Sequence, residues 1–403
     1  VAPAPWVKNE LWRKAREVPS LDLRFAEDKS LVDAITGSNL VDFTRASSGT
    51  YVGSDGLIKT ATTNEARFDH DPTTGESLGL LVEESRTNLL LRSEEFDTTW
   101  SASGASVSTN QTIAPDGNTT ADKLVCGTGT PIFQGIAQST TATASAAKFS
   151  VYVKAAELDQ IELRSFNPTD FAIFELSTQQ VLSESGSPDA TITDAGNGWY
   201  RCSIASSSSG VTSFRISLAS GGSRTFTGDG TSGIYLWGAQ LEEGSFPTSY
   251  IPTTTATVTR AADVASISGS NFSSWYNQSE GTVFYEGQVL GSDQSSNKDM
   301  LGLSDGTSNE FAKMFIPSGS NQRFRVDVGG VTQVLQNAIL PADVYSPVKA
   351  AFALKQNNTT CAGDGIVQSE DTSCLIPAVD RFVFGELSTG EPELAARYKR
   401  LTY

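Results

Sequence analysis

Aromatic and planar polar side chains stand together at two places in the chain. Trp199, Tyr200 and Arg201 follow a glycine-rich turn, and Trp275 and Tyr276 lie in a polar stretch before the last strand-rich segment. Aromatic rings stack on the faces of pyranose sugars, and planar polar groups pair with sugar hydroxyls. These five residues are the candidate sugar-binding residues. Core packing is the favoured alternative for the first two, since large aromatic side chains dominate sandwich cores; for the last two both interpretations stay open.

The residues that hydrolytic enzymes use are sparse. His70 is the only histidine and lies between two aspartates, without a Gly-x-Ser-x-Gly elbow in the chain, so a structural or solvated role is favoured. Adjacent glutamates occur at Glu83–Glu84, Glu94–Glu95 and Glu242–Glu243. Neighbours on a strand point to opposite faces, so none of these pairs can flank one glycosidic bond. No catalytic residue is assigned, and a carboxylate pair formed across strands stays open.

Metal ligands are equally sparse. Asp116, Asn118 and Asp122 could offer oxygen atoms to a structural calcium ion, but turn capping explains these residue types equally well. The four cysteines include no C-x-x-C pair, and with one histidine the sequence predicts no zinc site. Cys361 and Cys374 are close enough in the chain to bridge a loop. The favoured interpretation is nevertheless four free, partly buried thiols in a chain folded in a reducing cytoplasm.

Composition restricts the class of protein and its partners. The 403 residues carry a formal net charge of −17, which argues against nucleic acid, a partner that would need a basic stripe. No run of eighteen apolar residues occurs and no apolar signal segment opens the chain, so neither membrane insertion nor secretion is expected. Many short apolar runs between Gly, Ser and Thr favour β-sandwiches, and the length indicates two or three domains.

The start of the chain has a different character. Residues 5–18 are predicted to form a short amphipathic helix with one apolar face. A basic, aromatic helix at one end of an acidic chain would suit docking to another protein, whereas the alternative is a helix packed on its own β-domain. The candidate docking residues are Trp6, Lys8, Trp12, Arg13, Lys14 and Arg16.

The strands that must position the candidate residues are predicted from the alternation of apolar and polar side chains. Between residues 99 and 252, Ile161 and Leu163 alternate with Glu162 and Arg164, as expected for strands with one buried face. Many such strands at short spacing indicate an antiparallel sandwich, and residues 253–403 repeat the pattern. We expect four parts: a docking helix over 1–19, a collar over 20–98, and sandwiches over 99–252 and 253–403.

Three local expectations complete this outline. Gly53-Ser-Asp-Gly56 is flanked by strand-like residues and predicts a hairpin. Residues 391–401 have an acidic start and a basic end, which predicts a short helix. In the stretch Gly233–Asp263, a closing strand leads into a Pro/Thr-rich segment, which predicts a boundary near residue 252, a core position for Trp237 and an extended spacer.

Several short words of this sequence resemble bacteriophage fibre and spike proteins. The words are Phe43-Thr-Arg-Ala-Ser, Gly79-Leu-Leu-Val-Glu, Arg86-Thr-Asn-Leu-Leu, Phe149-Ser-Val-Tyr-Val-Lys, Gly198-Trp-Tyr-Arg-Cys and the stretch Gly233–Asp263. The resemblance implies a carbohydrate-binding-module-like jelly roll followed by a concanavalin/laminin-G-like sandwich. It further implies a homotrimer on the virion surface that joins capsid or tail proteins through its N-terminus and binds a host-surface glycan without cleaving it. The alternatives are a decoration or connector protein without a ligand and a capsular polysaccharide depolymerase.

Overall fold

The fold is all-β, as the sequence predicts. The computed structural model describes residues 18–129, 133–140, 147–165, 170–186, 189–206, 213–292, 297–318, 322–337, 345–387 and 394–403. Strands in these ranges pair antiparallel, and the described helices, α2 (Phe25–Asp28) and α3 (Gly269–Ser273), each span about one turn. The predicted docking helix and its six candidate residues fall outside the described residues, apart from Val18, which is exposed.

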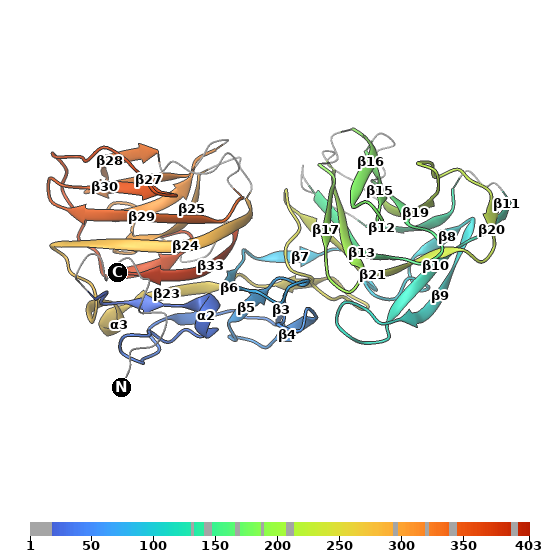
Figure 1. Ribbon diagram of the computed structural model, residues 1–403, viewed down its shortest axis with the longest axis horizontal. Helices are drawn as coiled ribbons and strands as arrows, with labels where there is room; N and C mark the ends of the chain where they lie inside the picture. Colours follow the sequence, from blue (N-terminus) through green and yellow to red (C-terminus); the bar gives the residue numbers. More distant parts are fainter. Residues whose placement is uncertain are drawn as a thin grey trace. The chain divides into compact units, whose positions relative to one another are not determined.

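The chain divides into two compact units (Figure 1). Unit 1 contains the described residues up to Thr44, Leu78–Glu83 and Asp263–Tyr403, and unit 2 contains Arg45–Ser77 and Glu84–Ala262. The segment 20–98, expected to form a collar of its own, is divided between the two units. Its strands β1, β2 and β6 join the sheets of unit 1, whereas in unit 2 β3 pairs with β4 and β7 pairs with β22 in two-stranded sheets. Such short strands offer too little apolar surface for a separate core.

Unit 1 is a sandwich of two antiparallel sheets. One runs in the order β31-β30-β29-β24-β33-β6, with β1 also paired to β33, and the other runs β2-β23-β32-β25-β26-β27-β28. The strands are β1 (Asp22–Leu23), β2 (Asp42–Thr44), β6 (Ser77–Val82), β23 (Val264–Ser268), β24 (Glu280–Ser292), β25 (Lys298–Ser304), β26 (Phe311–Ile316), β27 (Arg323–Val328), β28 (Val331–Asn337), β29 (Val348–Lys355), β30 (Thr360–Gly363), β31 (Ile366–Val367), β32 (Arg381–Phe384) and β33 (Leu394–Thr402). The ring of Phe324 on β27 stacks on that of Phe352 on β29, with centroids 5.0 Å apart, so the core lies between the sheets.

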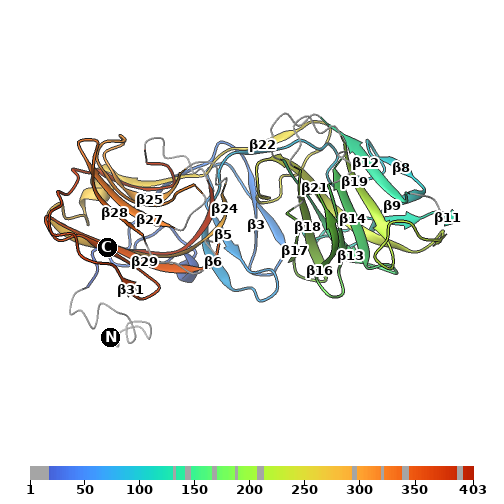
Figure 2. The same ribbon diagram turned by 90° about the horizontal axis from the view of Figure 1, so that it is seen from above.

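Unit 2 is built on a second sandwich, whose two six-stranded sheets pack face to face (Figure 2). They run β17-β18-β13-β21-β10-β9 and β16-β15-β14-β19-β12-β8. Its strands are β3 (Gly49–Val52), β4 (Ile58–Ala61), β5 (Arg67–His70), β7 (Arg86–Asn88), β8 (Ser101–Ser103), β9 (Ala105–Thr112), β10 (Ala121–Cys126), β11 (Thr128–Gly129), β12 (Gly135–Ser139), β13 (Ala147–Ala155), β14 (Gln160–Ser165), β15 (Phe171–Glu175), β16 (Gln180–Ser185), β17 (Thr191–Asp194), β18 (Trp199–Ser206), β19 (Ser213–Ala219), β20 (Gly228–Asp229), β21 (Gly233–Glu243) and β22 (Val258–Arg260). Alternating residues such as Val151 on β13 and Ile216 on β19 are fully buried between the sheets.

The predicted hairpin is confirmed, whereas the predicted spacer after residue 252 is not. The predicted hairpin is present as β3 and β4, which pair from Gly49 opposite Ala61 to Val52 opposite Ile58. The segment after residue 252 does not leave unit 2 as a free spacer. Thr253 is buried and its hydroxyl donates to the Leu90 carbonyl oxygen at 2.7 Å, and β22 pairs with β7. Threonine hydroxyls and strand pairing thus hold this segment on unit 2 until residue 262.

The helix predicted over residues 391–401 is wrong for its described part. Residues from 394 onward form β33, which lies between β24 and β6 in the first sheet of unit 1. Tyr398 is buried, its hydroxyl donates to the Met300 carbonyl oxygen at 2.6 Å, and its ring contacts Phe384. Pairing on both sides and burial outweigh the charge pattern that favoured a helix, because helix propensity is a weak prior. No helix in the described ranges is long and apolar enough to cross a membrane.

Candidate functional site

Each sandwich has two outer faces, and in unit 2 one of them is covered. This face belongs to the sheet that contains β13, β18 and β21, and it carries Tyr152, Trp199, Trp237 and Tyr250 in one buried cluster. The Trp237 and Tyr250 ring centroids are 4.5 Å apart, and Ile58 of β4 packs against the same cluster. This aromatic face is closed by residues of unit 2 itself, and the expected core position of Trp237 agrees with its 1% exposure.

The candidate residues Trp199, Tyr200 and Arg201 belong to this covered region and to the core beneath it. Trp199 is 1% exposed and its indole donates to the Ile113 carbonyl oxygen at 3.1 Å. Tyr200 points to the other side of β18 and packs at the margin of the main core. Arg201 donates to the Thr248 carbonyl oxygen at 2.6 Å. These contacts are packing contacts, in line with the favoured interpretation for the two aromatic residues.

Trp275 and Tyr276 also lie in an aromatic cluster, which belongs to unit 1. The Tyr276 ring stacks on Phe272 of α3 at 4.5 Å, and the Trp275 ring meets Tyr403 at 5.0 Å. Trp275 is only 5% exposed. Burial raises the pKa of the Tyr403 hydroxyl, which donates to the carbonyl oxygens of residues 277 and 280. The cluster holds Tyr403 in place, and the buried Trp275 has almost no ring surface available to a sugar.

The candidate metal ligands make hydrogen bonds within the protein: Asp116 caps a turn, as the alternative interpretation had it, whereas Asp122 on β10 joins separate segments. Asp116 accepts hydrogen bonds from the amide and side chain of Asn118 at 3.0 and 2.7 Å. Asp122 accepts from the amides of Phe96 and Asn110, both at 2.9 Å. No cluster of three or more His, Cys, Asp or Glu side chains suited to a metal ion occurs in the described part of the chain.

The residues considered for enzymatic chemistry make structural contacts. The His70 ring donates through Nδ1 to the Val52 carbonyl oxygen at 3.0 Å. Glu242 accepts from the Thr248 amide at 3.0 Å and from its hydroxyl. All four cysteines are buried and free, which agrees with the favoured interpretation, and burial raises the pKa of the Cys361 thiol to about 12.

A charged cluster occupies the outer face of the other sheet of unit 2. Glu162 and Arg164 stand two residues apart on β14, so both point away from the core. Arg164 donates to both oxygens of Glu162, from Nε at 2.9 Å and from Nη2 at 3.0 Å. Arg224, from the loop after β19, brings a second guanidinium to within 3.7 Å of the same carboxylate. Glu162 is 1% exposed although it lies on an outer face, because these guanidinium groups cover it.

A third arginine joins this cluster from the neighbouring strand. Arg215 on β19 is the register partner of Arg164 on β14. Its guanidinium lies over the Phe133 ring at 5.2 Å, whereas that of Arg164 lies over the Phe171 ring at 4.4 Å. The Nε atom of Arg215 is buried and has no hydrogen-bond partner among the described residues.

Next to Arg215, the outer face of the sheet carries small side chains. Its neighbour Ser217 pairs with Glu162 on one side and with Gly135 of β12 on the other, and Ala137 lies opposite Arg215. The Ser217 hydroxyl is buried and has no partner among the described residues. We call this surface the arginine face. It is formed by Phe133, Gly135, Ala137, Glu162, Arg164, Phe171, Arg215, Ser217 and Arg224.

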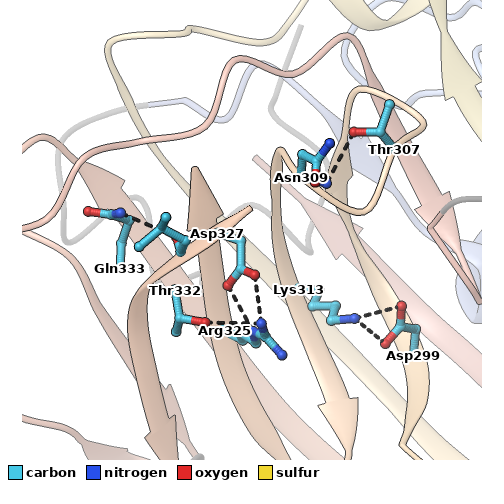
Figure 3. Close-up of polar contacts among 9 residues, drawn as sticks. Asp299, Thr307, Asn309, Lys313, Arg325, Asp327, Thr332 and Gln333 are labelled. Carbon is cyan, nitrogen blue, oxygen red and sulfur yellow. Dashed lines mark hydrogen bonds and ion pairs between the residues drawn. The ribbon is translucent and has the colours of Figure 1, made fainter. Parts of the chain in front are cut away.

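Unit 1 has a charged outer face that is organised differently (Figure 3). Lys313 on β26 contacts both oxygens of Asp299, at 2.7 and 2.9 Å, and Arg325 on β27 donates to both oxygens of Asp327 at 2.8 and 2.6 Å. Both cations lie over the Phe311 ring, at 4.5 and 5.5 Å. Each of these two cations has a carboxylate of its own. On the arginine face, by contrast, two guanidinium groups share Glu162.

Comparisons with known proteins identify no family for this chain. No family model matches, and no curated protein matches. One similar solved structure is the N-terminal tandem of two CBM22 domains from Paenibacillus barcinonensis Xyn10C, at 11% identity. The match covers 78% of this chain and 97% of that chain with a TM-score of 0.24. At this TM-score the likeness establishes neither a shared fold nor a shared ligand.

The arginine face has the chemistry of a polar recognition surface. Guanidinium groups donate in pairs to vicinal oxygens, and aromatic rings beneath them hold the planes in place. Glu162 holds the guanidinium groups of Arg164 and Arg224 in place. Sequence reasoning noted the alternation on β14 and β19 but did not select these residues. The available signal was that the outward positions of two strands carry Glu162, Arg164 and Arg215 in place of small hydroxyl residues.

Proposed function

We propose that this protein binds carbohydrate through the arginine face of unit 2. The observation that carries the proposal is the sharing of Glu162 by Arg164 and Arg224 beside Arg215, whose Nε lacks a partner among the described residues. Ordered polar groups on a rigid sheet need little reorganisation when a ligand binds, which preserves affinity. Phe133 and Phe171 add ring surface for sugar contacts.

The setting that we propose is the surface of a bacteriophage particle. The resemblance of several sequence words to fibre and spike proteins supports this setting, and a pair of β-sandwich units fits it. In this proposal the N-terminal segment attaches to other virion proteins, and several copies, as a homotrimer, present their arginine faces to the host surface. Avidity then compensates for a weak single site. The protein acts by adhesion and does not cleave the glycan.

A glycan array probed with the labelled full-length chain tests this proposal. We expect a signal for a subset of bacterial surface oligosaccharides, which is lost in a variant that combines Arg164→Met, Arg224→Met and Glu162→Gln. These three changes remove the shared carboxylate together with both of its cations, so neither Glu162 nor its two cations remain as unpaired charges. The control combines Arg325→Met with Asp327→Asn in unit 1 and should keep the signal.

Two results would contradict the proposal. The absence of any array signal from the parent chain would favour a connector protein without a ligand. New reducing ends released from the host polysaccharide would instead favour a depolymerase, and would require a carboxylate pair that faces the substrate.

A further inference from the structure

We infer that the arginine face selects acidic sugars, in which the pyranose carries a carboxylate or a sulfate group. This inference rests on the proposed function, because it names the class of carbohydrate that the same surface takes. Glu162, Arg164, Arg215 and Arg224 bring three guanidinium groups and one carboxylate together at the centre of the face. The local charge at this centre is therefore +2, although the whole chain is at −17.

Two further carboxylates lie on β15 or next to it. Glu175, at the far end of β15, accepts hydrogen bonds from Gln160 at 2.8 Å and Thr178 at 2.7 Å. Asp170 precedes β15 at the opposite end, next to Phe171, and is buried. Arg164 contacts both oxygens of Glu162, and Arg224 approaches the same carboxylate.

The register of β14 and β19 creates a need for an anion. Arg164 and Arg215 are directly opposite each other on antiparallel neighbours, and like charges in this position destabilise a sheet. The face also holds two buried polar atoms without a partner among the described residues, Arg215 Nε and Ser217 Oγ. Buried polar groups are nearly always hydrogen-bonded, so an unpartnered pair on one face points to a ligand.

The chemistry of these donors specifies the anion. A guanidinium group presents parallel N–H bonds that match the two oxygens of a carboxylate or sulfate, and a serine hydroxyl adds a third donor. Gly135 and Ala137, on the strand next to Arg215 and Ser217, carry no side chain that could accept a hydrogen bond from those donors. A neutral sugar offers only hydroxyls, which leave the excess positive charge uncompensated.

Three pairs of oligosaccharides test the inference. The probes are a galacturonate hexamer, an α2,8-linked sialic acid oligomer and a sulfated galactan oligomer, each with a neutral counterpart made by carboxyl reduction or desulfation. Calorimetry with the full-length chain should give at least one acidic probe that binds about tenfold or more tightly than its counterpart. Raising salt from about 0.05 M to about 0.5 M should weaken only the acidic probe. Preference for the sulfated probe alone would assign the anion as sulfate, and preference for a carboxylated probe would assign it as carboxylate.

Substitutions test whether the preference for acidic sugars depends on the arginine face. Arg215→Met should weaken the acidic probe by about tenfold or more and leave its neutral counterpart within about twofold. Arg224→Met changes a part-exposed loop side chain and serves as a second variant should Arg215→Met fold poorly. Lys154→Met removes a positive charge from β13 in the other sheet and is the matched control, with no expected change.

The outcomes separate this inference from the proposed function. Equal affinity for acidic and neutral partners would overturn the acidic preference and leave carbohydrate binding intact. Acidic binding that is equally weakened by Lys154→Met would also overturn it, because the effect would then be one of overall charge. Failure of every probe and of the glycan array would remove both.

Discussion

Arg164 on β14 lies directly opposite Arg215 on β19 in the sheet register, and both side chains point away from the core. Two like charges at such a position reduce sheet stability. Arg164 is compensated by Glu162, whereas Arg215 contacts the Phe133 ring and keeps an Nε without a partner among the described residues. The like-charge pair is therefore unfavourable for folding, and the anionic ligand that we propose would account for it.

Arg215→Met should leave unit 2 as stable as the parent or more stable, by up to about 1 kcal/mol. The substitution removes the like-charge pair and keeps a flexible apolar side chain over Phe133. Urea unfolding followed by circular dichroism measures the change. A loss of more than about 1 kcal/mol would mean that Arg215 serves the fold, and would contradict its assignment to ligand binding.

Trp199→Phe should destabilise unit 2 by about 1–2 kcal/mol without changing sugar affinity. The substitution removes the indole hydrogen bond to the Ile113 carbonyl oxygen and leaves a gap where the larger, 1% exposed ring is packed. Phe171→Leu is the matched change on the arginine face, and it should weaken sugar binding because the ring under Arg164 is lost. The reverse pattern, with binding lost in Trp199→Phe alone, would return the site to the aromatic face.

The fold class was predictable because alternation is a local property. Ile161 and Leu163 on β14, with Glu162 and Arg164 between them, specify a strand with one buried face wherever it is placed. The site was not predictable in the same way. Its β14 and β19 residues lie about fifty positions apart in the sequence, and only the register that places Arg164 opposite Arg215 shows that their charges meet.

The aromatic candidates illustrate the opposite difficulty. Trp199 and Arg201 have the side chains that sugars need, but burial depends on what lies over them, and residues of unit 2 such as Ile58 and Tyr250 complete the cover. No sequence pattern within β18 indicates that these residues will cover it. The strand β33 is a similar case: its charge pattern is typical of a helix, but the segment pairs with β24 and β6 in a sheet.

Glu94→Gln should stabilise unit 2 at neutral pH, and the gain should shrink as the pH falls. Desolvation raises the pKa of the Glu94 carboxyl above its ordinary value of 4.5, outweighing the hydrogen bond from the Tyr250 hydroxyl at 2.9 Å. A raised pKa in the folded state means that ionisation costs stability, so the cost is present at neutral pH and disappears below the ordinary value. The amide oxygen of Gln can still accept from Tyr250.

Thermal unfolding of the parent and Glu94→Gln at a series of pH values measures this effect. The difference between the two chains isolates Glu94, because other buried carboxyls with a raised pKa, such as Asp122, are common to both. A stability difference that grows as the pH falls would mean that folding lowers the pKa of Glu94, contrary to the prediction.

Gly79→Ala should destabilise unit 1 by about 2 kcal/mol or more. Gly79 on β6 has a φ of +93°, and a Cβ atom there would lie 2.1 Å from the Tyr398 carbonyl oxygen of β33. Gly37→Ala is the matched control in the same unit, since Gly37 also has a positive φ, of +72°, but a Cβ there meets nothing within 4 Å. Chemical denaturation of both variants compares them, and equal losses would show that the close approach of β6 and β33 is unimportant.

The most direct measurement is a crystal structure of the full-length chain with the best-binding acidic oligosaccharide. We predict a carboxylate or sulfate group within hydrogen-bonding distance of Arg215 Nε and Ser217 Oγ, with the pyranose ring against Phe133 or Phe171. Density for the sugar over Lys313 and Arg325 of unit 1, or over the aromatic face of unit 2, with the arginine face empty, would contradict this assignment.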